Sequence, residues 1–217
     1  MNDSTILQQI ARKDSNKERI SENIIKNSEL LPELFAGLQA PEARIKYGSN
    51  KVLILISEKN PAMLYPKLDF FITQLDSDNN FLKWGAIEII ANLCRVDSTH
   101  HFENIFNKYF SPIHEHHMIT AANTIKAAVK VASFKHNLTD KISEEILKVD
   151  NADYETTECN NIVIGQAISS LNELFPQLKT KEPVFAFVKK QLKNKRPATQ
   201  GVCPVCGTKL FRLVPFA

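Results

Sequence analysis

The chain has 217 residues, 43% of them hydrophobic and 24% charged, a composition that suits a protein with a substantial buried core. No apolar run approaches the roughly 18 residues of a membrane-spanning helix, which argues against a membrane partner. The start, Met1 to Ser4, lacks the order of a secretory signal, and four scattered cysteines do not suit a disulfide framework, so we expect a cytoplasmic location.

The net charge of +3 is distributed unevenly along the chain. From Lys179 onward there are nine basic residues and one acidic residue, Glu182, whereas the preceding part is net acidic. A basic C-terminal end suits contact with an anionic partner. We favour the simpler interpretation, which is a solvated polar face on the last helix.

The predicted elements are helices, because glycine is scarce and the prolines mostly fall between stretches of helical periodicity. Residues 1–27 are expected to form one or two amphipathic helices that cap the structure. A first helix pair is predicted near residues 30–39 and 42–57, separated by Pro41. Its second helix carries an apolar stripe at helical spacing.

The second helix pair, near residues 63–75 and from the turn at 76–80 to about Cys94, repeats the first pair. The segment Lys46-Tyr47-Gly48 recurs 37 residues later as Lys83-Trp84-Gly85. A period of about 20–50 residues is the signature of stacked repeats. We interpret the two aromatic residues as packing between repeats rather than as stacking platforms for bases, and the small residues as points of close helix approach.

Two further pairs and a final helix complete the predicted array. The third pair begins after Asp97-Ser98-Thr99, an expected N-cap cluster, and the fourth contains a polar turn at 150–157. A final helix near 183–195 ends where Arg196-Pro197 interrupts the pattern. The predicted divisions are capping helices (1–27), a repeat array (28–195) and a C-terminal tail (196–217).

Helix pairs of this length, with a proline early in the first helix, an acidic turn and a basic residue early in the second, resemble HEAT repeats of the armadillo-like class. The resemblance covers most of residues 28–195 and implies an all-α fold, a right-handed superhelix of about four to five HEAT-like repeats. In that family, acidic turn residues and basic second-helix residues bond between repeats as a ladder. The matching positions here are Asp76, Asp78, Arg44, Lys46 and Lys83, and the ladder residues are missing or substituted in the third and fourth units.

The resemblance also implies that the second helices line a concave surface that holds a partner. Polar residues on the outward face of these helices are the expected partner contacts: Lys51, Glu88, Asn92, Asn123, Lys126 and Lys130. Taken singly, each is also consistent with an ordinary solvated position. We therefore expect a non-enzymatic scaffold that binds a protein or peptide, with no cofactor.

Two alternative functions remain open. The first is nucleic-acid binding through the basic C-terminal end, which would give an affinity that falls steeply with salt. The second is an enzyme that resembles the DNA alkylation-repair glycosylases built from HEAT-like helices. Those enzymes need a catalytic acid and aromatics in one basic groove, whereas the aromatics here are expected in the core. No serine-histidine-aspartate order, paired carboxylates or glycine-rich phosphate loop is evident.

Two groups of residues have the side chains of metal ligands. His114, His116 and His117 lack the spacing of a helical zinc motif, and we interpret them as part of a solvent-facing turn. Cys203 and Cys206, in Cys-Pro-Val-Cys-Gly, resemble a zinc-ribbon knuckle, but a structural zinc needs four ligands. The site would be completed by a second chain or by a histidine of the array. We favour the alternative of a metal-free tail.

Overall fold

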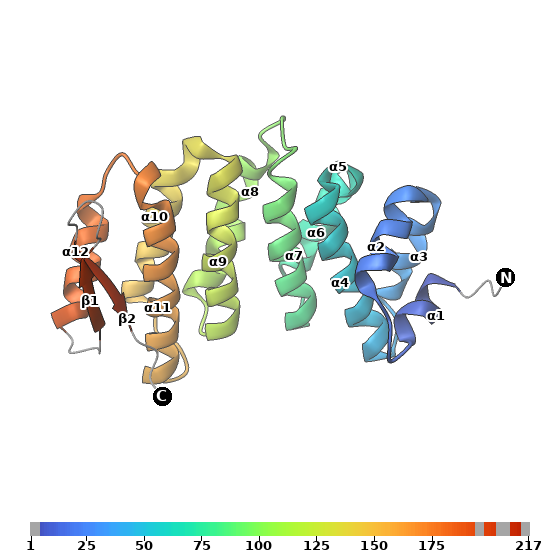
Figure 1. Cartoon of the computed structure of the whole chain (residues 1–217), viewed down its shortest axis with the longest axis horizontal. Coiled ribbons are helices and arrows are strands. Elements are labelled where there is room, and N and C mark those ends of the chain that lie inside the picture. The colour runs from blue at the N-terminus through green and yellow to red at the C-terminus, as the bar shows by residue number, and fades with distance from the viewer. Residues whose placement is uncertain (1–4, 194–197, 203–208, 214–217) are drawn as a thin grey trace.

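The computed structural model describes residues 5–193, 198–202 and 209–213, and Figure 1 shows the chain as an elongated row of helices. The α-helices are α1 (Ile6–Ala11), α2 (Lys17–Lys26), α3 (Leu31–Gly37), α4 (Ala43–Lys59), α5 (Pro61–Leu64), α6 (Leu68–Gln74), α7 (Asn80–Leu93), α8 (His101–Phe110), α9 (Met118–Phe134), α10 (Thr139–Leu147), α11 (Thr157–Leu174) and α12 (Glu182–Lys193). The strands are β1 (Ala198–Val202) and β2 (Lys209–Leu213). In the described part of the chain, no helix has both the length and the hydropathy needed to cross a bilayer.

The long helices pack one against the next in chain order, α2 on α4, α4 on α7, α7 on α9 and α9 on α11. Figure 1 shows α7, α9 and α11 side by side, with α1 and α12 at opposite ends of the row. The shorter helices α3, α6 and α10 each pack on the long helix that follows them. Helix α8 is joined to α7 through Tyr109, whose buried hydroxyl donates to the Ile87 carbonyl oxygen at 3.0 Å.

The prediction of an all-helical protein is confirmed for residues 5–193, and two details differ. The helix predicted near 63–75 is divided into α5, a 3-10 turn at Tyr65–Lys67 and α6. Pro66 lies in that turn and lacks the N–H that a continuous α-helix would use. The tail, for which no strands were predicted, contains β1 and β2, which pair antiparallel with Ala198 opposite Leu213 and Val202 opposite Lys209.

The glycine of the recurring segment allows neighbouring helices to approach closely. A Cβ at Gly85 would overlap the amide of Asn50 on α4, and a Cβ at Gly48 would overlap Ile10 on α1. The Asn50 amide nitrogen donates to the carbonyl oxygen of Phe81 at 2.8 Å, in the first turn of α7. The prediction that small residues mark close approach is therefore confirmed at both glycines.

Replacing Gly85 with alanine should destabilise the protein by about 1–2 kcal/mol, because the overlap with Asn50 outweighs the better helix propensity of alanine. In an Asn50→Ala background the same change should stabilise by about 0.5–1 kcal/mol, because the overlap is gone. Gly165→Ala is the matched control: it lies in α11 with no atom within 4 Å of an added Cβ, and it should be stabilising. Urea unfolding measures all four variants, and an equal effect of Gly85→Ala in both backgrounds would contradict the role given to Asn50.

Candidate functional site

A groove of about 300 Å³ lies on the face formed by the long helices α4, α7 and α9. Its lining residues are Tyr47, Asn50, Lys51, Ile54, Phe81, Trp84, Gly85, Ile87, Glu88 and Asn123. Three of the expected partner contacts, Lys51, Glu88 and Asn123, are therefore brought together from three different helices. Concave surfaces with apolar walls and a few polar groups are the usual form of a binding site.

An aromatic row forms one side of this groove and consists of Tyr47, Phe81 and Trp84. The centroids of the Tyr47 and Phe81 rings are 4.7 Å apart, and those of Phe81 and Trp84 are 5.1 Å apart. Phe81 is 53% exposed, although phenylalanine side chains are usually buried. The row is therefore an apolar surface that is open to solvent at its middle ring.

The two outer rings of the aromatic row are fixed by hydrogen bonds to neighbouring units. The Trp84 Nε1 donates to Thr120 Oγ1 on α9 at 2.9 Å, and the Asn79 side-chain amide donates to the Tyr47 hydroxyl at 3.3 Å. Asn79 also caps α7, since its Oδ1 accepts from the Phe81 and Leu82 amides. Tyr47 and Trp84 thus contact neighbouring helix pairs, and the same residues also line the groove.

The polar side of the groove begins one helical turn beyond the aromatic row. Lys51 follows Tyr47 by four residues on α4, and Glu88 follows Trp84 by four residues on α7. Glu88 forms an ion pair with Lys130 of α9, whereas Lys51 is exposed and has no ion pair or hydrogen bond among the described residues. Lys126 is also exposed and lies on α9 one turn from Asn123.

One expected contact residue has a different role. Asn92 is only 5% exposed, and its side-chain amide donates to Ser57 Oγ of α4 at 2.8 Å. It therefore joins α4 to α7 and does not face a partner. The expectation was wrong for Asn92 because its helical position borders the face that packs on the preceding long helix.

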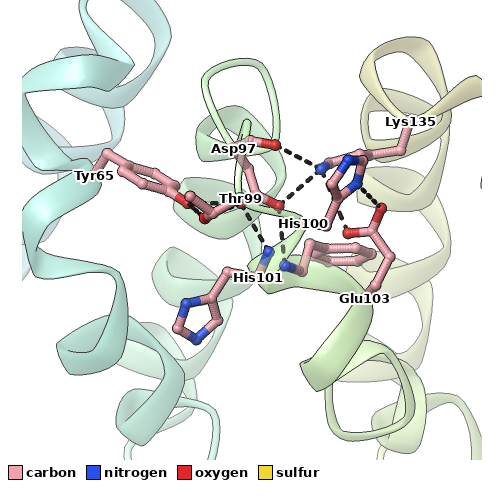
Figure 2. Close-up of polar contacts among 8 residues, drawn as sticks. Tyr65, Asp97, Thr99, His100, His101, Glu103 and Lys135 are labelled. Carbon is pink, nitrogen blue, oxygen red and sulfur yellow. Dashed lines mark hydrogen bonds and ion pairs between the residues drawn. The ribbon is translucent and has the colours of Figure 1, made fainter.

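A second polar cluster lies between the units, at the connection of α7 to α8. Figure 2 shows Asp97 between Tyr65 and Lys135, which come from opposite sides of the connection. The Lys135 Nζ lies 2.8 Å from Asp97 Oδ2 and also 2.8 Å from the Asp97 carbonyl oxygen. The Tyr65 hydroxyl donates to Asp97 Oδ1 at 2.6 Å, and the backbone amides of His101 and Phe102 donate to the same carboxylate. The N-cap residue of α8 is His100 rather than a member of the expected cluster Asp97-Ser98-Thr99, although the Asp97 side chain does accept from two amides of the first turn.

The charged forms of Asp97 and Lys135 stabilise each other. Burial tends to raise the pKa of Asp97, but hydrogen bonds from Lys135, Tyr65 and the two amides outweigh it and hold this pKa well below its ordinary value. Burial tends to lower the pKa of Lys135, but its bond and attraction to Asp97 raise this pKa above its ordinary value. Because both side chains are at least 94% buried and fully occupied with each other, we interpret the cluster as a structural clamp.

The other residues around the clamp complete its contacts. The Glu103 Oε2 lies 3.4 Å from Lys135 Nζ, and Glu103 Oε1 lies 2.8 Å from His100 Nδ1. His100 is the one non-glycine residue with a positive φ in the described part of the chain, at 57°. That left-handed turn brings the amide of His101 onto Asp97 (Figure 2). The amide of Phe102 donates to the same carboxylate.

The three histidines that we interpreted as part of a solvent-facing turn contact separate partners. The His114 Nε2 lies 3.5 Å from Glu145, His116 bonds the Asp153 carbonyl oxygen, and His117 lies 3.7 Å from Glu155. Within the described ranges, no three ligand side chains are grouped to hold a metal ion. Each of these histidines instead contacts the unit that follows, so they link units in the way the ladder residues were expected to.

Within the described part of the chain, only some of the ladder residues bond to a neighbouring unit, and their partners differ from those that the HEAT-repeat resemblance implied. Asp76 bonds Lys108 of α8 at 2.6 Å, and Lys83 lies 3.9 Å from Glu115. Arg44 donates to the Ala11 carbonyl oxygen. The acidic turn residue Asp76 thus contacts the first helix of the next unit, and the basic residue Lys83 contacts the turn of the next unit.

Two of the four cysteines lie in the helical part of the chain, and the other two belong to the C-terminal tail. Cys94 is buried, and burial raises its pKa well above the ordinary value, so its thiol is unreactive at neutral pH. Cys159 is half-buried near the start of α11. The candidate metal ligands Cys203 and Cys206 lie outside the described residues.

The groove between α4, α7 and α9 is thus the candidate site, and Phe81 is the residue that sequence reasoning missed there. A signal was available, because Phe81 is a large apolar residue that falls outside the apolar stripe of its helix. Comparison with known proteins identifies no family: no protein-family model matches the chain, and no curated protein matches it significantly.

Proposed function

We propose that this chain is a non-enzymatic scaffold of HEAT-like helical repeats that binds a protein or peptide segment on the face of its long second helices. The observation that carries the proposal is the groove itself, with the exposed ring of Phe81 at its centre and fixed rings on either side. Exposed aromatic residues with polar neighbours are the usual anchors of a protein interface.

The repeat architecture is supported by side-chain bonds that join successive long helices at separations close to the 37-residue period. Trp84 bonds Thr120 of the next long helix across 36 positions, and Asn92 bonds Ser57 of the preceding one across 35. The long helices also pack in chain order without exchanging neighbours. A stack of this kind presents its long helices as one continuous surface, which suits an extended segment of a partner.

A selection of peptides from a displayed random library, on the immobilised full chain, tests the proposal. Peptides that bind this face should lose about 30-fold in affinity with Phe81→Ala, because a central aromatic anchor contributes about 2 kcal/mol. Phe81 is the suitable position because its exposed ring can be removed with little loss of stability, while its backbone bond to Asn50 remains.

Phe185→Ala is the matched control for this selection. Phe185 is 61% exposed, on α12 at the far end of the row, so its removal should leave the affinity unchanged. If every enriched peptide binds the Phe81→Ala protein as tightly as the unaltered protein, the groove is not the binding surface and the proposal is wrong.

A further inference from the structure

We infer that the segment held in this groove is acidic: a peptide whose large apolar side chain packs on Phe81 and Trp84 while its carboxylates reach Lys51 and Lys126. The inference rests on the proposed function and adds the chemistry of the partner. It is carried by the charge that remains unpaired around the groove, together with the distance between its apolar and polar sides.

Positive charge remains around the groove when the side chains that form ion pairs within the chain are left out of the count. The carboxylate of Glu88, the one acidic group that lines the groove, already has an ion pair with Lys130. Lys51 lines the groove as well, is exposed, and has no charged partner in the described part of the chain. The open charge at this site is therefore positive, which favours a partner of opposite sign.

The same sign is found on the next long helix. Lys126 on α9 is exposed and has no partner among the described residues, and it lies one turn beyond the groove residue Asn123. The unpaired ammonium groups thus come from α4 and α9, the two helices that flank α7 and its Phe81. A segment that crosses α7 would have one basic group on each side of its anchor.

The spacing of the two sides defines what the partner must carry. The basic residue of α4 follows Tyr47 by one turn, or about 5–6 Å along the helix. A partner whose apolar side chain lies on the aromatic row can therefore place carboxylates one or two residues away over Lys51 and Lys126. Two lysines and one exposed phenylalanine ring provide few contacts for the phosphates and bases of a nucleic acid. We therefore favour an acidic peptide.

Trp84 provides a direct measurement, because it is the only tryptophan of the chain and lines the groove. The probes are three 12-residue peptides that contain a central Leu-Phe pair and lack tryptophan and tyrosine. Glutamate flanks the pair in the first, glutamine in the second and lysine in the third. We expect the glutamate peptide to change the Trp84 emission with an affinity about tenfold higher than that of the glutamine peptide, at low salt. The lysine peptide should bind more weakly than both.

A charge reversal at Lys51 provides the second arm of the test. With Lys51→Glu the order of the glutamate and lysine peptides should invert, whereas Lys67→Glu should leave it unchanged. Lys67, in the 3-10 turn before α6, is also exposed, has no partner among the residues that the structure describes, and does not line the groove.

The outcomes separate this inference from the function on which it depends. If all three peptides bind equally, or the lysine peptide binds best, the acidic partner is wrong while the groove remains a peptide site. A single-stranded oligonucleotide that changes Trp84 emission where the glutamate peptide does not would also overturn it, in favour of nucleic acid. If no probe changes the emission and selected peptides are insensitive to Phe81→Ala, the proposed function fails with it.

Discussion

Replacing Asp97 with alanine is expected to lower the free energy of unfolding by about 3–5 kcal/mol, far more than the loss of an exposed ion pair would. The change leaves the ammonium group of Lys135 buried without its carboxylate, since Lys135 is only 5% exposed and lies 2.8 Å from Asp97. It also removes the acceptor for the Tyr65 hydroxyl and for two amides in the first turn of α8. Urea unfolding followed by circular dichroism measures the loss.

Two controls separate the buried pair from ion pairing in general. Asp76→Ala removes an equally short ion pair to Lys108 that also joins two units, but the Asp76 side chain is 69% exposed, so the cost should stay below about 1 kcal/mol. Lys135→Met should cost less than Asp97→Ala, because the Asp97 carboxylate keeps its four other donors, two hydroxyls and two amides. The double variant should cost clearly less than the sum of the single changes, and additive costs would contradict a coupled pair.

The same pair predicts how stability depends on pH. Because the pKa of Asp97 is lowered in the folded protein, its contribution is fully present above about pH 3.9 and is lost as the pH falls through the lower folded value. Because the pKa of Lys135 is raised, its contribution is present below about pH 10.4 and is lost as the pH rises through the higher folded value. Asp97→Asn should therefore flatten the acid side of the stability profile, and an unchanged slope below pH 4 would contradict this.

The sequence predicted part of this clamp and could not predict the rest. Asp97 precedes a helical stretch within a cluster of residues that favour the N-cap, and that local signal indicated a role at the start of α8. Tyr65 and Lys135 are 32 and 38 positions away, and nothing in their immediate neighbours distinguishes them from exposed residues. Their burial depends on how one helix pair is rotated on the next, which local periodicity does not determine.

The fold was largely predictable from the sequence, whereas the groove was not. Helical spacing and proline positions predicted most helices to within a few residues, because each helix buries one stripe wherever it lies in the stack. The exposed residues that gather at the groove come from three helices, and only their packing decides which of them are open. The sequence did not predict the positions of Phe81 and Asn92 for this reason. Phe81 is an apolar residue that is exposed, and Asn92 is a polar residue that is buried.

Replacing Phe106 with alanine is expected to cost about 3–5 kcal/mol, comparable to the loss of Asp97 but through packing rather than charge. Phe106 is 1% exposed and belongs to a cluster of aromatic rings on α8. Its ring centroid is 4.7 Å from that of Phe110, and the Lys141 ammonium group of α10 lies 4.0 Å above it. Its removal therefore leaves a cavity at a place where α8 meets the following unit.

The position of this cavity along the row makes a second, qualitative result testable. Because each long helix packs mainly on its neighbours in the chain, a loss near the middle should weaken the coupling between the helices before α8 and those after it. Trp84 reports the surroundings of α7, including its bond to Thr120 of α9, while circular dichroism reports all helices. We expect the two urea transitions to coincide in the unaltered protein and to separate in Phe106→Ala.

Phe106→Leu is the control, because it nearly conserves the volume of the side chain. It should cost less than about 1.5 kcal/mol and keep the transitions together. Coincident transitions in Phe106→Ala would mean that the helices on both sides of α8 unfold as one cooperative unit.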